Sequence, residues 1–142
     1  MANWTRIKRL RAFLETVPPK RLRMDKLLLI DKDNETIKQA LEPSCGTVAC
    51  MAGWTHCLFT PKTTRLHRTS YHSLGGMCNV SDVDAEPAGD MLGLDEDEAC
   101  HMFSGGWSAK SLDVLTKRDV LRYLDQAIAA KDVMVTLQET TK

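Results

Sequence analysis

The stretch that most constrains the fold of this chain runs from Cys45 to Trp54, with the sequence Cys-Gly-Thr-Val-Ala-Cys-Met-Ala-Gly-Trp. Almost every residue from Thr47 to Phe59 is apolar or small. A helix that is apolar on all sides has to be buried, and small residues let neighbouring elements approach its backbone closely. We therefore expect a buried central helix over Thr47–Phe59. Ser44 or Thr47 is expected to cap its start, and Trp54 and Trp107 are expected to anchor the core.

The length and composition are those of one ordinary globular domain. The chain has 142 residues, of which 43% are apolar and 27% are charged, and a chain of this length can bury a core without disulfides or metals. Its five cysteines are an odd number, and its N-terminus carries no apolar signal region. No apolar run approaches the length of a membrane span. These features predict free thiols and a cytoplasmic protein that does not bind membranes.

Helical periodicity recurs along most of the chain. Apolar residues at three- and four-residue spacing from Trp4 predict an amphipathic helix that ends at Pro18-Pro19. Short helices are expected over 35–41 and 83–92, the second with Gly93 as its C-cap. Capping boxes predict two further helices; their residues are Asp95 with Glu98 and Thr116 with Asp119.

The predicted fold class is mainly α: a compact single-domain bundle of five or six helices around the buried central helix, with at most a small β element. Residues 1–130 are expected to form the helical domain. Residues 131–142 are expected to be a C-terminal tail or edge segment.

The formal net charge is zero, but the charges are unevenly distributed. Residues 1–26 hold eight basic and two acidic side chains, whereas residues 82–98 hold eight acidic side chains and no Lys or Arg. Both segments can be solvated faces that attract each other within the fold. Alternatively they form a bipolar surface, with a basic face for an acidic partner or an acidic face that mimics nucleic acid. Helices on either side of Gly93 have the outline of a helix-turn-helix. The second begins with four acids, which would meet phosphates, so direct nucleic-acid binding is disfavoured.

Chemical alternatives centre on the cysteines and histidines. Cys45, Cys50, His67 and His72 have a spacing near that of a zinc site, although Cys45 and Cys50 would point about 140° apart within one helix. A catalytic thiol would need a lowered pKa and a base in reach; a helix start near Cys45 supplies only the first. Small buried thiols without a cofactor are the simpler interpretation. A small-ligand-sequestering protein, with a pocket near Trp54 or Tyr71, is a further alternative.

The motif order resembles small uncharacterised proteins of bacteriophages, plasmids and bacteria. The shared pattern is Cys-Gly-Thr-x-x-Cys-x-x-Gly-Trp at 45–54, followed by a Leu-Gly-Leu turn, an acidic helix start, a Phe and a Trp; here these are Leu92, Gly93, Leu94, Glu98, Phe103 and Trp107. The resemblance covers roughly residues 45–130, and this chain departs from it in its His-bearing loop at 60–80. It implies a mostly helical fold and a mobile-element origin, and it implies no activity.

These observations lead us to expect a non-enzymatic protein that binds a protein partner. In the setting that the resemblance implies, it would be a phage or mobile-element accessory protein, such as an anti-defence inhibitor that occludes a host factor. The expected contact surface is either the loop or the acidic strip; the residues are Arg65, His67, Arg68, Tyr71 and His72, or Asp82, Asp84, Glu86, Asp95 and Glu96. No catalytic residue and no cofactor are expected. Zinc-stabilised modules and thiol enzymes remain alternatives.

Overall fold

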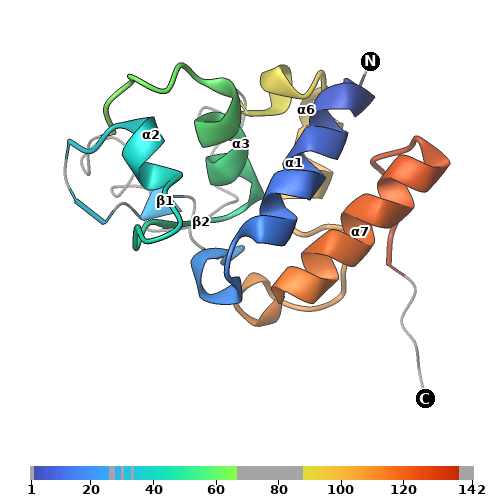
Figure 1. Ribbon diagram of the computed structural model, residues 1–142. Helices are drawn as coiled ribbons and strands as arrows, with labels where there is room; N and C mark the ends of the chain where they lie inside the picture. Colours follow the sequence, from blue (N-terminus) through green and yellow to red (C-terminus); the bar gives the residue numbers. More distant parts are fainter. Residues whose placement is uncertain (1, 26–27, 30, 33, 67–87, 138–142) are drawn as a thin grey trace.

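The part of the chain that is described in the structure, a computed structural model, is mainly α-helical with one small two-stranded sheet (Figure 1). It covers residues 2–25, 28–29, 31–32, 34–66 and 88–137. This architecture confirms the predicted fold class. Among the described helices, none combines the length and apolarity that a bilayer crossing needs.

Two long helices from opposite ends of the chain pack side by side. They are α1 (Trp4–Thr16) and α7 (Lys117–Ala130). Each buries one apolar stripe at helical spacing; the residues include Ile7, Leu10 and Leu14 in α1 and Val120, Leu124 and Ala127 in α7. As expected, α1 ends directly before the proline pair, with Val17 as its C-cap, and the short 3-10 helix η1 (Pro19–Arg21) follows.

The apolar segment at the centre of the chain divides into a strand and a helix. β2 (Val48–Ala49) pairs antiparallel with β1 (Leu28–Leu29), with Leu28 opposite Ala49. Helix α3 (Met51–Phe59) then begins after Cys50, which is its N-cap and makes no side-chain cap hydrogen bond. The predicted helix over Thr47–Phe59 is therefore wrong in its first turn, and neither Ser44 nor Thr47 is the cap. The strand exists because a distant segment supplies its hydrogen-bonding partners, which an apolar run alone does not reveal.

α6 (Glu96–Phe103) and α7 begin at the predicted capping boxes, whereas the helix expected over 35–41 is shorter and has a capping box that was not predicted. α2 (Ile37–Ala40), α6 and α7 each start with a capping box, formed by Thr36 with Gln39, Asp95 with Glu98, and Thr116 with Asp119. Residues 88–91 are helical, and Gly93 follows with a positive φ of 70°, as a C-cap glycine requires. The rest of the predicted helix at 83–92 lies outside the described residues. The 3-10 helix η3 (Leu112–Val114) precedes α7.

Residues 131–137 pack onto α6 and α7. Val133 and Leu137 are buried; the Tyr123 hydroxyl donates to the Val133 carbonyl, and the Leu137 amide donates to the Trp107 carbonyl at 2.8 Å. The Nε2 atom of His101 lies 2.8 Å from the Val135 carbonyl oxygen. This part of the terminal segment belongs to the packed domain, although no strand is assigned in it; residues 138–142 lie outside the described part.

Candidate interaction surface

A buried arginine organises the chain around the Cys45–Trp54 segment. Arg21 is only 5% exposed. Its guanidinium donates to the carbonyl oxygens of Thr47 at 2.8 Å, Ala40 at 2.7 Å and Glu42 at 3.0 Å. Its Cζ atom lies 5.2 Å from the ring centroid of Trp54, whose indole N–H donates to the Arg21 carbonyl. Arg21 therefore satisfies backbone acceptors at the end of α2 and along the loop that joins α2 to β2, and it packs on the central tryptophan.

Hydrogen bonds connect the polar residues at the start of the Cys45–Trp54 segment to Glu35 and its neighbours. Glu35 is 5% exposed, and its carboxylate accepts hydrogen bonds from the Thr47 hydroxyl and the Lys32 amide. The Thr47 hydroxyl also accepts from the Asp31 amide at 2.9 Å. The Cys45 sulfur lies 3.7 Å from a Glu35 oxygen and accepts from the Thr47 amide at 3.4 Å. These contacts join the loop after β1 to the loop before β2.

The cysteines in and just after this segment are fully or partly buried. Cys50 and Cys57 have no exposed surface, and Cys45 is half-buried. Burial raises the pKa of the Cys57 thiol to about 12, and the nearby Glu35 carboxylate adds to that shift. Trp54 and Trp107 are fully buried, which confirms their prediction as core anchors. Cys100 is exposed, and Cys78 lies outside the described residues.

The structure changes the geometry on which the zinc and thiol-enzyme alternatives rested. Cys45 precedes α3 by several residues and Cys50 caps it, so the two do not share a helix, and Cys45 is not at a helix start. His67 and His72 lie outside the described residues, and within the described part no three metal-ligating side chains form a group. His56 is half-buried, and burial lowers its pKa.

Only three of the expected contact residues, Arg65, Asp95 and Glu96, belong to the described part of the chain. Arg65 is exposed and donates to the Asn34 carbonyl at 2.9 Å, which ties the start of the loop to the turn before α2. Asp95 and Glu96 are exposed at the start of α6, where Asp95 accepts from the Glu98 amide. The other expected contact residues lie outside the described part; they are His67, Arg68, Tyr71, His72, Asp82, Asp84 and Glu86.

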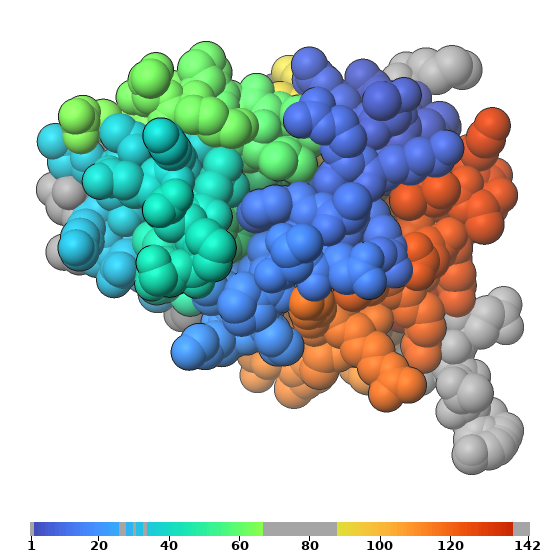
Figure 2. Space-filling model, viewed as in Figure 1, coloured from blue at the N-terminus to red at the C-terminus, as the bar shows by residue number. Residues whose placement is uncertain are grey.

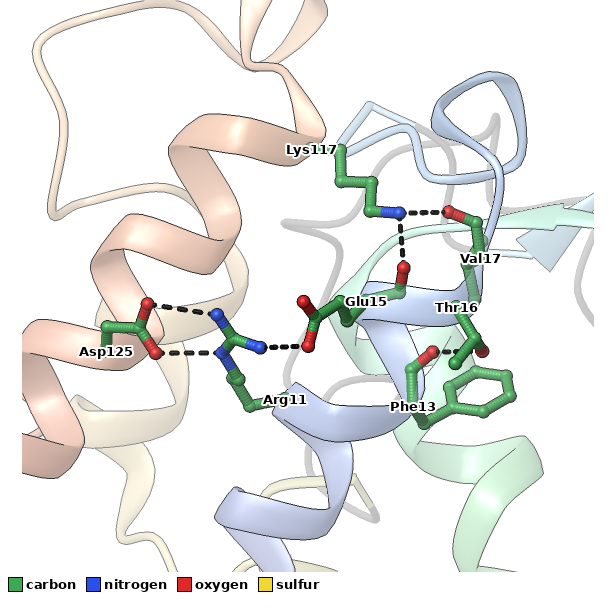
Figure 3. Close-up of polar contacts among 7 residues, drawn as sticks. All are labelled: Arg11, Phe13, Glu15, Thr16, Val17, Lys117 and Asp125. Carbon is green, nitrogen blue, oxygen red and sulfur yellow. Dashed lines mark hydrogen bonds and ion pairs between the residues drawn. The ribbon is translucent and has the colours of Figure 1, made fainter.

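Besides the loop and the acidic strip, the structure shows a third candidate surface. It lies where α1 and α7 pack side by side on one face of the molecule (Figure 2). Arg11 of α1 holds Asp125 of α7 through two hydrogen bonds, at 2.8 and 3.1 Å, and also binds Glu15 (Figure 3). Neighbouring Asp125 and Glu15 raise the pKa of Arg11, the Asp125 hydrogen bond contributing most. Lys117 donates to the carbonyls of Glu15 and Val17, which satisfies acceptors at the C-terminal end of α1.

These contacts show that the two helices are antiparallel, because the first residue of α7 meets the end of α1. On an α-helix, residues three or four positions apart share a face. Lys8 therefore lies beside Arg11 on α1, and Arg118 and Arg122 lie along the side of α7 that carries Asp125. We call the five cations Lys8, Arg11, Lys117, Arg118 and Arg122 the basic face. Lys8, Arg118 and Arg122 are exposed, and none has an ion pair with a described residue.

Other cations of α1 are already engaged. Arg6 and Arg9 lie 5.0 and 5.1 Å from the ring centroid of Phe59 in α3, and Arg6 also donates to the Met91 carbonyl. They fasten α1 to its neighbours and are not part of the basic face. The sequence predicted the basic first helix but not the contribution of α7 to this surface. The signal available was the pair Arg118 and Arg122, four residues apart on the polar side of the last helix.

Comparison with known proteins identifies neither a family nor a function for this chain. No protein-family model matches the chain, and no curated protein or solved structure matches it.

Proposed function

We propose that the chain is a non-enzymatic binding protein that recognises another protein and occludes a functional site on it. The observation that supports this most directly is the unneutralised charge on the α1–α7 pair, where Lys8, Arg118 and Arg122 are exposed without an ion pair among the described residues. Charges placed in this way favour encounter with a partner of opposite sign.

The contacts that join α1 and α7 within that surface also support a binding role. A surface that is ordered before binding loses less entropy when it binds. The bidentate contact of Arg11 with Asp125 and the two carbonyl contacts of Lys117 tie the helices together from middle to end. With the mobile-element origin that the resemblance implies, the partner we propose is a host factor in the cytoplasm, and the role is that of an anti-defence inhibitor.

The test is chemical cross-linking in cells that produce the protein, followed by native mass spectrometry of the purified complexes. We expect a cross-linked protein partner at a fixed stoichiometry. A chain that purifies alone and gives no cross-link would contradict the proposal. A bound zinc ion in the same spectra would instead favour the zinc-stabilised module.

A further inference from the structure

We propose that the basic face is the docking surface and that its occupant is an acidic segment of the partner protein. This inference rests on the proposed function and adds the surface and the chemistry of the partner. It differs from the loop and the acidic strip that the sequence favoured.

The exposed cations lie on either side of the Arg11–Asp125 pair: Lys8 is three residues before Arg11 in α1, and Arg122 and Arg118 are three and seven residues before Asp125 in α7. Arg11 occupies the middle and binds both carboxylates nearby, Asp125 and Glu15. Because the helices are antiparallel, Arg118 and Arg122 lie toward the end of α1, whereas Lys8 lies toward its beginning. Each residue rises about 1.5 Å along a helix, so roughly 15 Å of helix separates the level of Lys8 from that of Arg118. An extended or helical segment of a few turns spans that length.

The negative charge around Arg11 distinguishes between an acidic protein segment and a nucleic acid as the ligand of the basic face. Two carboxylates against one guanidinium leave a local excess of negative charge at Arg11. Duplex DNA carries a charge about every 1.7 Å along its axis, so a backbone lying across the face would set phosphates against Asp125 and Glu15. A protein segment can place its acids opposite Lys8, Arg118 and Arg122 and uncharged residues opposite the two carboxylates. The charge pattern therefore favours a protein.

The test compares two double variants with equal changes in net charge. R118E with R122E reverses the basic face, and K32E with K38E reverses two exposed cations in and before α2, which Figure 1 shows apart from α7. Fluorescence anisotropy measures the binding of a short labelled poly-L-glutamate peptide and of a duplex DNA of equal total charge. Thermal melting followed by circular dichroism identifies any variant that has not folded, and R118Q with R122Q provides a milder version.

We expect the peptide to bind the wild-type protein more tightly than the DNA does. We expect R118E with R122E to weaken peptide binding by about tenfold or more, because two attractions become repulsions. The α2 control is expected to change it by less than about twofold, since screening limits distant charges. Equal losses in both double variants, or tighter binding of DNA, would overturn the inference.

The cross-linking experiment separates this inference from the proposed function. If the wild-type protein captures a partner in cells and R118E with R122E captures it equally well, the proposed function stands and the basic face is not the docking surface. If the α2 control retains the partner and R118E with R122E loses it, the inference is supported. If the wild-type protein captures nothing, the proposed function itself is contradicted.

Discussion

The buried guanidinium of Arg21 allows the sharpest test of how this fold is held together. Replacing Arg21 by Met keeps an unbranched side chain of similar reach but removes every donor. Two of its hydrogen bonds, to the carbonyls of Thr47 and Ala40, are buried, and a third, to Glu42, is partly buried. The variant R21M therefore leaves backbone acceptors without this donor at the end of α2 and in the loop before β2.

The expected cost follows from those contacts. A buried acceptor that loses its partner costs about 1–3 kcal/mol. Two fully buried carbonyls, with a smaller contribution from Glu42 and from the lost contact with Trp54, give about 3–5 kcal/mol. Part of this is offset, because the variant no longer buries a charge. A domain of this kind has a total stability of about 5–15 kcal/mol, so R21M should remain measurable at low temperature but melt far below the wild-type protein.

Urea unfolding followed by tryptophan fluorescence and by circular dichroism measures this difference. The matched control is R23M, because the Arg23 side chain is exposed and pairs only with Asp25 among the described residues; an exposed pair of this kind contributes about 0–1 kcal/mol. R21K should lie between the two, since an ammonium cannot reproduce the planar fork that reaches several carbonyls. A cost below about 1 kcal/mol for R21M would refute the structural role assigned to Arg21.

Three further predictions address acid stability, thiol reactivity and the loop. Burial of Asp119 raises its pKa, but hydrogen bonds from the Thr116 amide, Lys110 and the Thr116 hydroxyl outweigh this and hold the pKa below its ordinary value. The stabilisation from this low pKa is present above the unfolded pKa of about 4 and is lost as the pH falls through the folded pKa. Urea unfolding at several pH values should therefore show that the free energy of unfolding of D119N decreases less in acid than that of the wild-type protein. Alkylation with iodoacetamide, located by peptide mass spectrometry, should modify exposed Cys100 in the native protein and leave Cys50 and Cys57 unmodified until urea is added; early labelling of Cys57 would contradict its burial. Replacing Arg65, Arg68 and Tyr71 by Ala should leave the melting temperature nearly unchanged, and reduced partner binding in a pull-down would assign contact to the loop as well.

Local sequence patterns predicted the helices well because their signals lie within a few residues of one another. The proline pair ends α1, the capping boxes begin α6 and α7, and Gly93 takes the positive φ that its position in a turn requires. The burial of Trp54, Trp107 and Cys50 was predicted on the same basis, since bulky apolar residues in apolar runs have to leave water.

Long-range contacts explain what the sequence did not reveal. The sequence predicts Val48 and Ala49 to be the first turn of a helix. In the structure they form strand β2 instead, because β1 supplies their hydrogen-bonding partners. Arg21 lies in a strongly basic segment that the sequence predicts to be exposed. Its guanidinium is nevertheless buried, because three backbone carbonyls from the end of α2 and the loop after it converge on it.

The amino-acid sequence by itself determined the helical class of this protein, the end of α1, the starts of α6 and α7, and the burial of Trp54 and Trp107, because those properties depend on neighbouring residues and on apolar content. Only the tertiary structure decided that α1 and α7 run antiparallel, that Arg11 joins them through Asp125, and that Lys8, Arg118 and Arg122 share one face. The physical reason is that residues about a hundred positions apart are brought together by the burial of two apolar stripes. Helical spacing places a charge on a side of its own helix, whereas packing decides which other helix lies beside it.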